Sequence, residues 1–109
     1  MKKQNMEHTH LLVLSLLAGE DMYGYQMIVE LARRSDHTFE LKEGTLYPIL
    51  HALEAERLVT VREKEAETGR VRKYYRITKK GMKALEEKKE EWRLFTKKVN
   101  DVACGTSPA

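Results

Sequence analysis

The hydrophobic positions of the chain recur at helical spacing in four segments and alternate with polar positions in two shorter segments. Residues 11–17 are apolar on nearly every side of a helix, which predicts a first helix over residues 7–17 that is buried on more than one face. Apolar residues three and four positions apart predict two further helices, over residues 22–34 and from about residue 44 to residue 56. The buried stripe of the third helix consists of Leu46, Ile49, Leu50 and Leu53.

Turn-forming residues mark the ends of these helices. Gly19 suits a left-handed cap at the end of the first helix, and Asp21 can accept hydrogen bonds as the N-cap of the second. Pro48 would break a helix interior but costs little within about the first turn, because the backbone N–H groups there have no partner within the helix. The third helix therefore begins near Gly44 or Thr45.

The alternating segments, residues 58–64 and 70–78, predict a β-hairpin whose loop ends at Gly69. The order of three helices and a hairpin predicts a winged helix-turn-helix, a mainly α fold of the α+β class with a two-stranded wing. Alternation also gives the second strand two faces. The face toward the core carries Val71, Tyr75 and Ile77, and the outer face carries Arg70, Arg72, Tyr74 and Arg76.

The basic residues are clustered, although the net charge of +3 is modest. Residues 68–83 carry seven Lys or Arg and no acid, and a basic, aromatic surface of this kind is suited to the phosphates of nucleic acid. An ordinary solvated face is the alternative. Lys79 and Lys80 argue against it, because they oppose the helix macrodipole by about 0.3–1 kcal/mol each unless a phosphate lies nearby. The candidate DNA contacts here are Arg70, Arg72, Lys73, Tyr74, Lys79 and Lys80.

The outer face of the third helix carries small residues, which permit close approach to a duplex. At the start of this helix Thr45 and Tyr47 can reach outward. Packing within the fold is an equal alternative for Tyr47 and Tyr74, and Tyr75 is assigned to the core. The further candidate DNA contacts are Gly44, Thr45, Tyr47 and His51.

A fourth helix is predicted over residues 79–103, capped by Thr78. Its apolar residues repeat every seven positions on one narrow seam, which is typical of a helix that pairs with a partner helix. We therefore predict a DNA-binding domain over residues 1–78, beginning with a mobile arm at 1–5, a C-terminal dimerisation helix over 79–103 and a disordered tail over 104–109. The predicted dimer interface consists of Leu11, Leu85, Trp92, Phe95, Val99 and Val102.

Three fragments together resemble the PadR-type transcriptional regulators: Met22-Tyr23-Gly24-Tyr25, Gly44-Thr45-Leu46-Tyr47-Pro48, and the run from Gly69 to Thr78 followed by Gly81. The resemblance extends from about residue 11 to residue 102. It implies a homodimeric bacterial repressor that binds an inverted repeat, with the recognition helix starting at Gly44, Thr45 and Tyr47 and the wing at Arg70, Arg72 and Lys73. The chain departs from the family at Arg57, where many relatives have the glycine of a left-handed cap.

Trp92, the single tryptophan, has two interpretations. The simpler one is a hydrophobic anchor between two paired helices. The other is that Trp92 and its mate form an aromatic slot for a flat effector, with Phe95, Leu11 and Val99 as walls. The two interpretations are compatible.

Other classes of function find little support in the sequence. No nucleophile, base and orienting group can be combined, so we do not expect an enzyme. No metal or other cofactor is expected, since His8 and His10 point to different sides of a helix. One cysteine, no apolar run of about 20 residues and no secretory signal predict a cytoplasmic protein without a membrane span. The remaining alternative is a winged helix that binds another protein instead of DNA.

Overall fold

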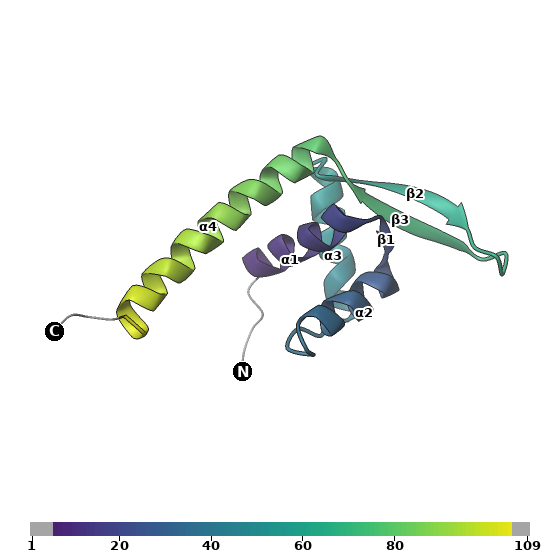
Figure 1. The fold of residues 1–109 in the computed structure, drawn as a ribbon. Helices are drawn as coiled ribbons and strands as arrows, with labels where there is room; N and C mark the ends of the chain where they lie inside the picture. The colour runs from purple at the N-terminus through teal and green to yellow at the C-terminus, as the bar shows by residue number, and fades with distance from the viewer. Residues whose placement is uncertain (1–5, 106–109) are drawn as a thin grey trace.

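A computed structural model describes residues 6–105 of the chain; the predicted arm at residues 1–5 and the last four residues of the predicted tail lie outside this description. The elements follow one another in the order α1 (Met6–Gly19), β1 (Met22–Tyr23), α2 (Gly24–Arg34), α3 (Glu43–Ala55), β2 (Val59–Glu65), β3 (Val71–Ile77) and α4 (Lys79–Ala103). Figure 1 shows a body of α1, α2 and α3, from which the hairpin of β2 and β3 and the long α4 project in opposite directions. The winged helix-turn-helix prediction is confirmed.

Strand β1 is an element that the hydrophobic pattern did not predict. It pairs with β3 in an antiparallel sheet of order β1-β3-β2, with Met22 opposite Tyr75 and Tyr23 opposite Tyr74. Helix α2 consequently begins at Gly24, and its N-cap is Tyr23. Asp21 does not cap it, as the sequence had suggested, because its carboxylate binds Arg76 of β3 at 3.0 Å.

One hydrophobic core joins the three helices of the body, the sheet and the first turns of α4. The predicted stripe of α3 is fully buried in it, together with Val13, Leu14 and Leu17 of α1 and Tyr75 of β3. Tyr75 therefore has the core position that alternation predicted. Leu85 of α4 is also completely buried in this core.

The turn after α3 keeps a left-handed residue without a glycine. Arg57 has a φ of 63°, and the N–H groups of Arg57 and Leu58 donate to the carbonyls of Glu54 and Leu53. These two bonds form the Schellman motif that usually ends in glycine. The left-handed cap is thus present at Arg57, although the family's glycine is missing. The left-handed cap expected at Gly19 is absent, because Gly69 is the one glycine with positive φ among the described residues.

The start of α4 is tied to this turn by Thr78 and Gly81. The Thr78 hydroxyl accepts a hydrogen bond from the Gly81 N–H at 2.9 Å and itself donates to the carbonyls of Arg57 and Leu58. A Cβ on Gly81 would collide with the Leu58 carbonyl. Glycine at position 81 therefore fixes the direction in which α4 leaves the body.

Replacing Gly81 by Ala should lower the free energy of unfolding by about 1–3 kcal/mol, because backbone would have to move to admit the methyl group. Gly19→Ala is the matched control, since a Cβ there would meet nothing within 4 Å. Urea denaturation of both variants at one protein concentration measures the difference. Equal stability of the two variants would contradict the close contact at Gly81.

Candidate nucleic-acid interface

The wing, formed by β2, β3 and their turn, has one strongly basic face. Residues opposite each other in an antiparallel pair lie on the same face; Arg62 lies opposite Tyr74, and Lys64 lies opposite Arg72. Among the described residues no ion pair engages Arg62, Lys64 or Arg72. Two cations directly opposite each other destabilise a hairpin, so a bound anion would relieve their repulsion. Arg62 and Lys64 were missing from the sequence-based candidates.

The other face of the wing is of mixed charge. Lys73 lies opposite Glu63, and Val71 lies opposite Glu65. Lys73, predicted as a DNA contact together with Arg72, is therefore separated from it by the thickness of the strand. Val71 was predicted to face a core but is 58% exposed, because the hairpin extends past the helices that could cover it (Figure 1). Arg70 is exposed in the turn next to Gly69.

Tyr23 supports the basic face from β1. The Arg72 guanidinium carbon lies 4.3 Å from the centre of the Tyr23 ring, and the Tyr23 and Tyr74 rings meet edge to face at 5.4 Å. The Lys64 ammonium lies over Tyr74 at 5.4 Å from the ring centre. Two contacting rings thus each carry a cation on one surface, an arrangement that holds long side chains in place. Tyr74 has a packing role as well as a position on the basic face.

The exposed surface of α3 begins at its N-terminus. Gly44 and His51 are exposed and Thr45 is half-buried, and open space surrounds Gly44 on its side-chain side. Pro48 is also exposed, in the sixth position of the helix. Because proline has no N–H, the Gly44 carbonyl lacks its usual helical donor.

Tyr47 does not reach outward as predicted. Its ring is partly buried against the core, and its hydroxyl occupies the place that a side chain on Gly24 would need. Packing between α3 and α2 is therefore the correct alternative for Tyr47. The signal for this was the glycine in the fragment Met22-Tyr23-Gly24-Tyr25, which permits the close approach.

These contacts connect the start of α3 with the wing. Tyr47 of α3 touches Gly24, the neighbouring Tyr23 touches Arg72 and Tyr74, and Tyr74 touches Lys64. Residues from α3, the start of α2 and the hairpin are thus fixed relative to one another. The remaining candidates, Lys79 and Lys80, are exposed in the first turn of α4. That turn is bonded to the C-terminal end of α3, about 18 Å along the helix from Gly44.

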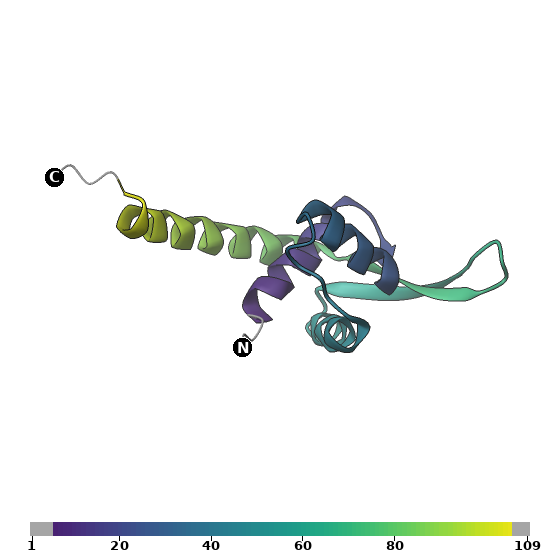
Figure 2. The ribbon, with the colours of Figure 1, turned by 90° about the horizontal axis from the view of Figure 1, so that it is seen from below.

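The apolar seam of α4 is buried at its N-terminal end and exposed to solvent along the rest of its length. Leu85, at its near end, is completely buried in the core of its own chain, so its assignment to a dimer interface is wrong. Further along, Trp92 is 41% exposed, Phe95 56% and Val102 88%, and Val99 is exposed as well. Figure 2 shows α4 extending beyond the end of α1, which explains why the outer part is uncovered. Leu11 is half-buried on α1 against the core.

The Trp92 ring makes two contacts with other aromatic rings. The ring of His8 meets it edge to face, with centres 4.7 Å apart, and Phe95 lies beside it with centres 5.8 Å apart. One side of the indole is thus covered by α1 of the same chain. The rest of the ring remains accessible.

His10, two residues after His8 on α1, should make the stability of the fold depend on pH. Burial lowers the pKa of His10 below its ordinary value, and Lys88 lowers it further, while Glu56 acts in the opposite direction. Between the lowered pKa and about 6.5 the unfolded chain binds more protons than the folded one, so the free energy of unfolding should fall as pH decreases through that window. Denaturation at several pH values should show this loss. His10→Gln should remove it and His37→Gln should not; a full pH dependence in His10→Gln would contradict the assignment.

Neither a metal-binding cluster nor a membrane-spanning helix occurs among the described residues. No group of three or more His, Cys, Asp or Glu side chains that could hold a metal ion occurs within residues 6–105. None of the helices described is both long and apolar enough to cross a bilayer.

Comparison with known proteins agrees with this architecture. Residues 13–87 match the model of the transcriptional regulator PadR-like family. A solved transcriptional regulator from Clostridium thermocellum is 34% identical with a TM-score of 0.82, and the match covers 89% of this chain and 94% of that one. A transcriptional regulator of Mycobacterium tuberculosis is 40% identical over 75 residues, which are 69% of this chain and 66% of that protein. The regulator YqjI of Escherichia coli is 26% identical over 97 residues, 89% of this chain but 45% of its own.

The fold and the match together define a winged-helix regulator of transcription. The chain belongs to the PadR-like family. This confirms the resemblance seen in the three sequence fragments, and the relatives named above are transcriptional regulators.

Proposed function

We propose that the protein is a repressor that binds an inverted-repeat operator as a homodimer. Residues 1–78 bind the DNA and residues 79–103 hold the dimer together. Helix α3 enters the major groove, with Gly44 and Thr45 in its N-terminal half and His51 in its C-terminal half, and the basic face of the wing contacts the sugar-phosphate backbone.

The observation that carries this proposal is the unpaired charge on the wing. Arg62, Lys64 and Arg72 share one face without an ion pair in the described part of the chain, and Arg72 is held against Tyr23. Side chains positioned in advance lose less conformational entropy on binding, so they favour a rigid, regularly spaced polyanion. Duplex DNA is such a partner.

The outer part of the α4 seam supports the homodimer in this proposal. Trp92, Phe95, Val99 and Val102 form an apolar row on a helix that extends past the rest of its own chain. A second copy of the same row would cover it around a two-fold axis. Two symmetric DNA-binding domains then require two symmetric half-sites.

Fluorescence anisotropy with labelled duplexes tests this function. The full chain should bind the DNA upstream of its own gene more tightly than a shuffled duplex, and affinity should fall steeply with salt, with a slope of about −0.9 for each phosphate contacted. A winged helix used for protein contact would show neither effect. Absence of any binding at low salt would contradict the proposal.

The same proposal includes an aromatic effector at the paired Trp92 residues. The accessible side of the indole, with Phe95 beside it, offers a flat apolar surface on α4. A ligand there would change operator affinity only if it favours one dimer arrangement over another. Titration of planar compounds, followed by Trp92 fluorescence and by operator binding, tests this. Compounds that change the emission and leave operator affinity unchanged would exclude an effector role.

A further inference from the structure

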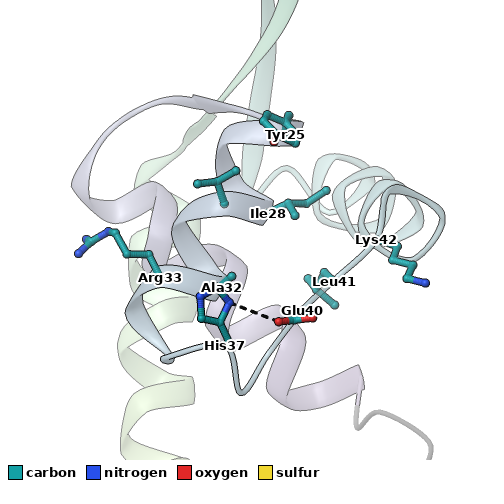
Figure 3. Close-up of a pocket in the computed structure, with 9 residues that line it drawn as sticks. Tyr25, Ile28, Ala32, Arg33, His37, Glu40, Leu41 and Lys42 are labelled. Carbon is teal, nitrogen blue, oxygen red and sulfur yellow. Dashed lines mark ion pairs between the residues drawn. The ribbon is translucent and has the colours of Figure 1, made fainter.

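A pocket outside the surfaces described so far lies between α2 and the loop that leads into α3. Its volume is about 450 Å³. Figure 3 shows Ile28 and Ala32 on α2 facing Leu41 across it, with Tyr25 at one end and the ion pair of His37 and Glu40 at the other. The pocket is thus bordered by α2 and by the loop that ends at Lys42, the N-cap of α3.

Helix α2 contributes exposed apolar side chains to the lining of this pocket. Tyr25 and Val29 are one turn apart on α2, and they are 61% and 47% exposed. The solvent side of a surface helix normally carries polar residues. Exposed apolar side chains that line a concavity are a sign of a binding site.

The charged residues at the edge of the pocket differ in whether they already form an ion pair within the chain. Arg33 is bound to Glu30 at 2.6 Å, and the hydrogen bonds from Arg33 and Arg34 lower the pKa of Glu30 to about 2. His37 Nδ1 lies 3.3 Å from a Glu40 oxygen. Lys42 has no ion pair among the residues described, and its side chain lines the pocket.

Lys42 also occupies a special position in the backbone. It is the N-cap of α3, and its side chain makes no capping hydrogen bond. The first N–H groups of a helix and the positive end of its macrodipole favour an anion at this place. In Figure 3 the ammonium points away from the cavity, but rotation of its flexible four-carbon chain can bring it to the mouth.

We propose that this pocket binds a small organic anion that has an apolar body and one carboxylate. The body contacts Ile28, Val29 and Leu41, and the carboxylate binds the Lys42 ammonium at the start of α3. Binding at this site does not depend on the function proposed above. A ligand here bridges α2 and the entry to α3, so it acts on the helix pair that carries the proposed recognition surface.

Amide chemical shifts of the full-length, ¹⁵N-labelled protein test the proposal with a matched pair of probes. Cyclohexanecarboxylate should shift amides within residues 25–42 with a dissociation constant on the order of 1 mM. Neutral cyclohexanecarboxamide should bind about tenfold more weakly, because it lacks the charge-assisted hydrogen bond. Acetate, which lacks the apolar body, should not shift these amides at the same concentrations.

Two exposed substitutions locate the site without disturbing the core. Lys42→Gln should abolish the preference for carboxylate over carboxamide, and Val29→Glu should abolish binding of the carboxylate by repulsion. Lys89→Gln, an exposed change on α4, should bind as the unmodified chain does. The proposal is overturned if the carboxylate shifts no amide within residues 25–42, if both probes bind equally, or if Lys42→Gln keeps the preference.

Discussion

Changing Trp92 to Ala together with Val99 to Asp should convert the proposed dimer to a monomer and weaken binding to a two-half-site operator by about 10²- to 10⁴-fold. Both side chains belong to the exposed row on α4, and an aspartate there would be buried without a partner in the dimer. Affinity falls because the second half-site contact is intramolecular in a dimer and bimolecular in a monomer. No DNA-contacting residue is altered. The loss would therefore come from valence alone.

Leu94→Asp is the control for this variant. Leu94 is also exposed on α4, at 52%, but at two residues from Trp92 it lies on the opposite side of the helix. It should remain dimeric and bind the operator normally. Sedimentation and anisotropy on the same samples measure both quantities. A dimer that survives the double change, or a monomer that retains full affinity, would refute the assignment of the seam.

The double variant Arg62→Ala with Arg72→Ala should weaken binding to every duplex by about 10- to 100-fold and reduce the salt slope by about two units. Each guanidinium is assigned one phosphate, and neither forms an ion pair in the described chain. The ratio of operator to random affinity should change little, since phosphate contacts carry no sequence information. Thr45→Ala, by contrast, should lower mainly that ratio.

Two further variants show whether loss of positive charge anywhere on the protein is enough to weaken DNA binding and lower the salt slope. Lys97→Ala with Lys98→Ala removes the same charge from the far end of α4, away from the wing (Figure 1), and should leave the salt slope unchanged. Tyr23→Leu keeps both arginines but removes the ring under Arg72. It should lower affinity without altering the slope, because the number of phosphates neutralised stays the same. The wing would make no specific contact with DNA if the salt slope fell equally in the Arg62→Ala, Arg72→Ala variant, the Lys97→Ala, Lys98→Ala variant and Tyr23→Leu.

The boundaries of α3 and of the hairpin were predictable to within one or two residues because local signals specify them. The helix has a stripe of four buried residues, and the hairpin has alternation on both sides of a turn with Gly69. Strand β1 has no such signal. Two residues cannot show a period, and they form a strand only because Tyr74 and Tyr75 lie beside them in the fold.

The interface was predictable in part. The segment Val61-Arg62-Glu63-Lys64-Glu65 alternates base and acid, so Arg62 and Lys64 could have been placed on one face from the sequence. Lys73 was grouped with Arg72 because the family resemblance maps both to the wing, although adjacent residues in a strand point apart. Heptad spacing identified the seam of α4, but spacing does not reveal that Leu85 is buried in the core of its own chain.

The central claim, a two-fold dimer on two half-sites, is tested most directly by hydroxyl-radical footprinting of the DNA upstream of the gene. The unmodified protein should protect two half-sites related by two-fold symmetry, with centres about 10–10.5 base pairs or a multiple of that distance apart. The Trp92→Ala, Val99→Asp variant should leave the same positions unprotected at the same concentration. A single protected segment, or no protection by a protein that sediments as a dimer, would contradict the account.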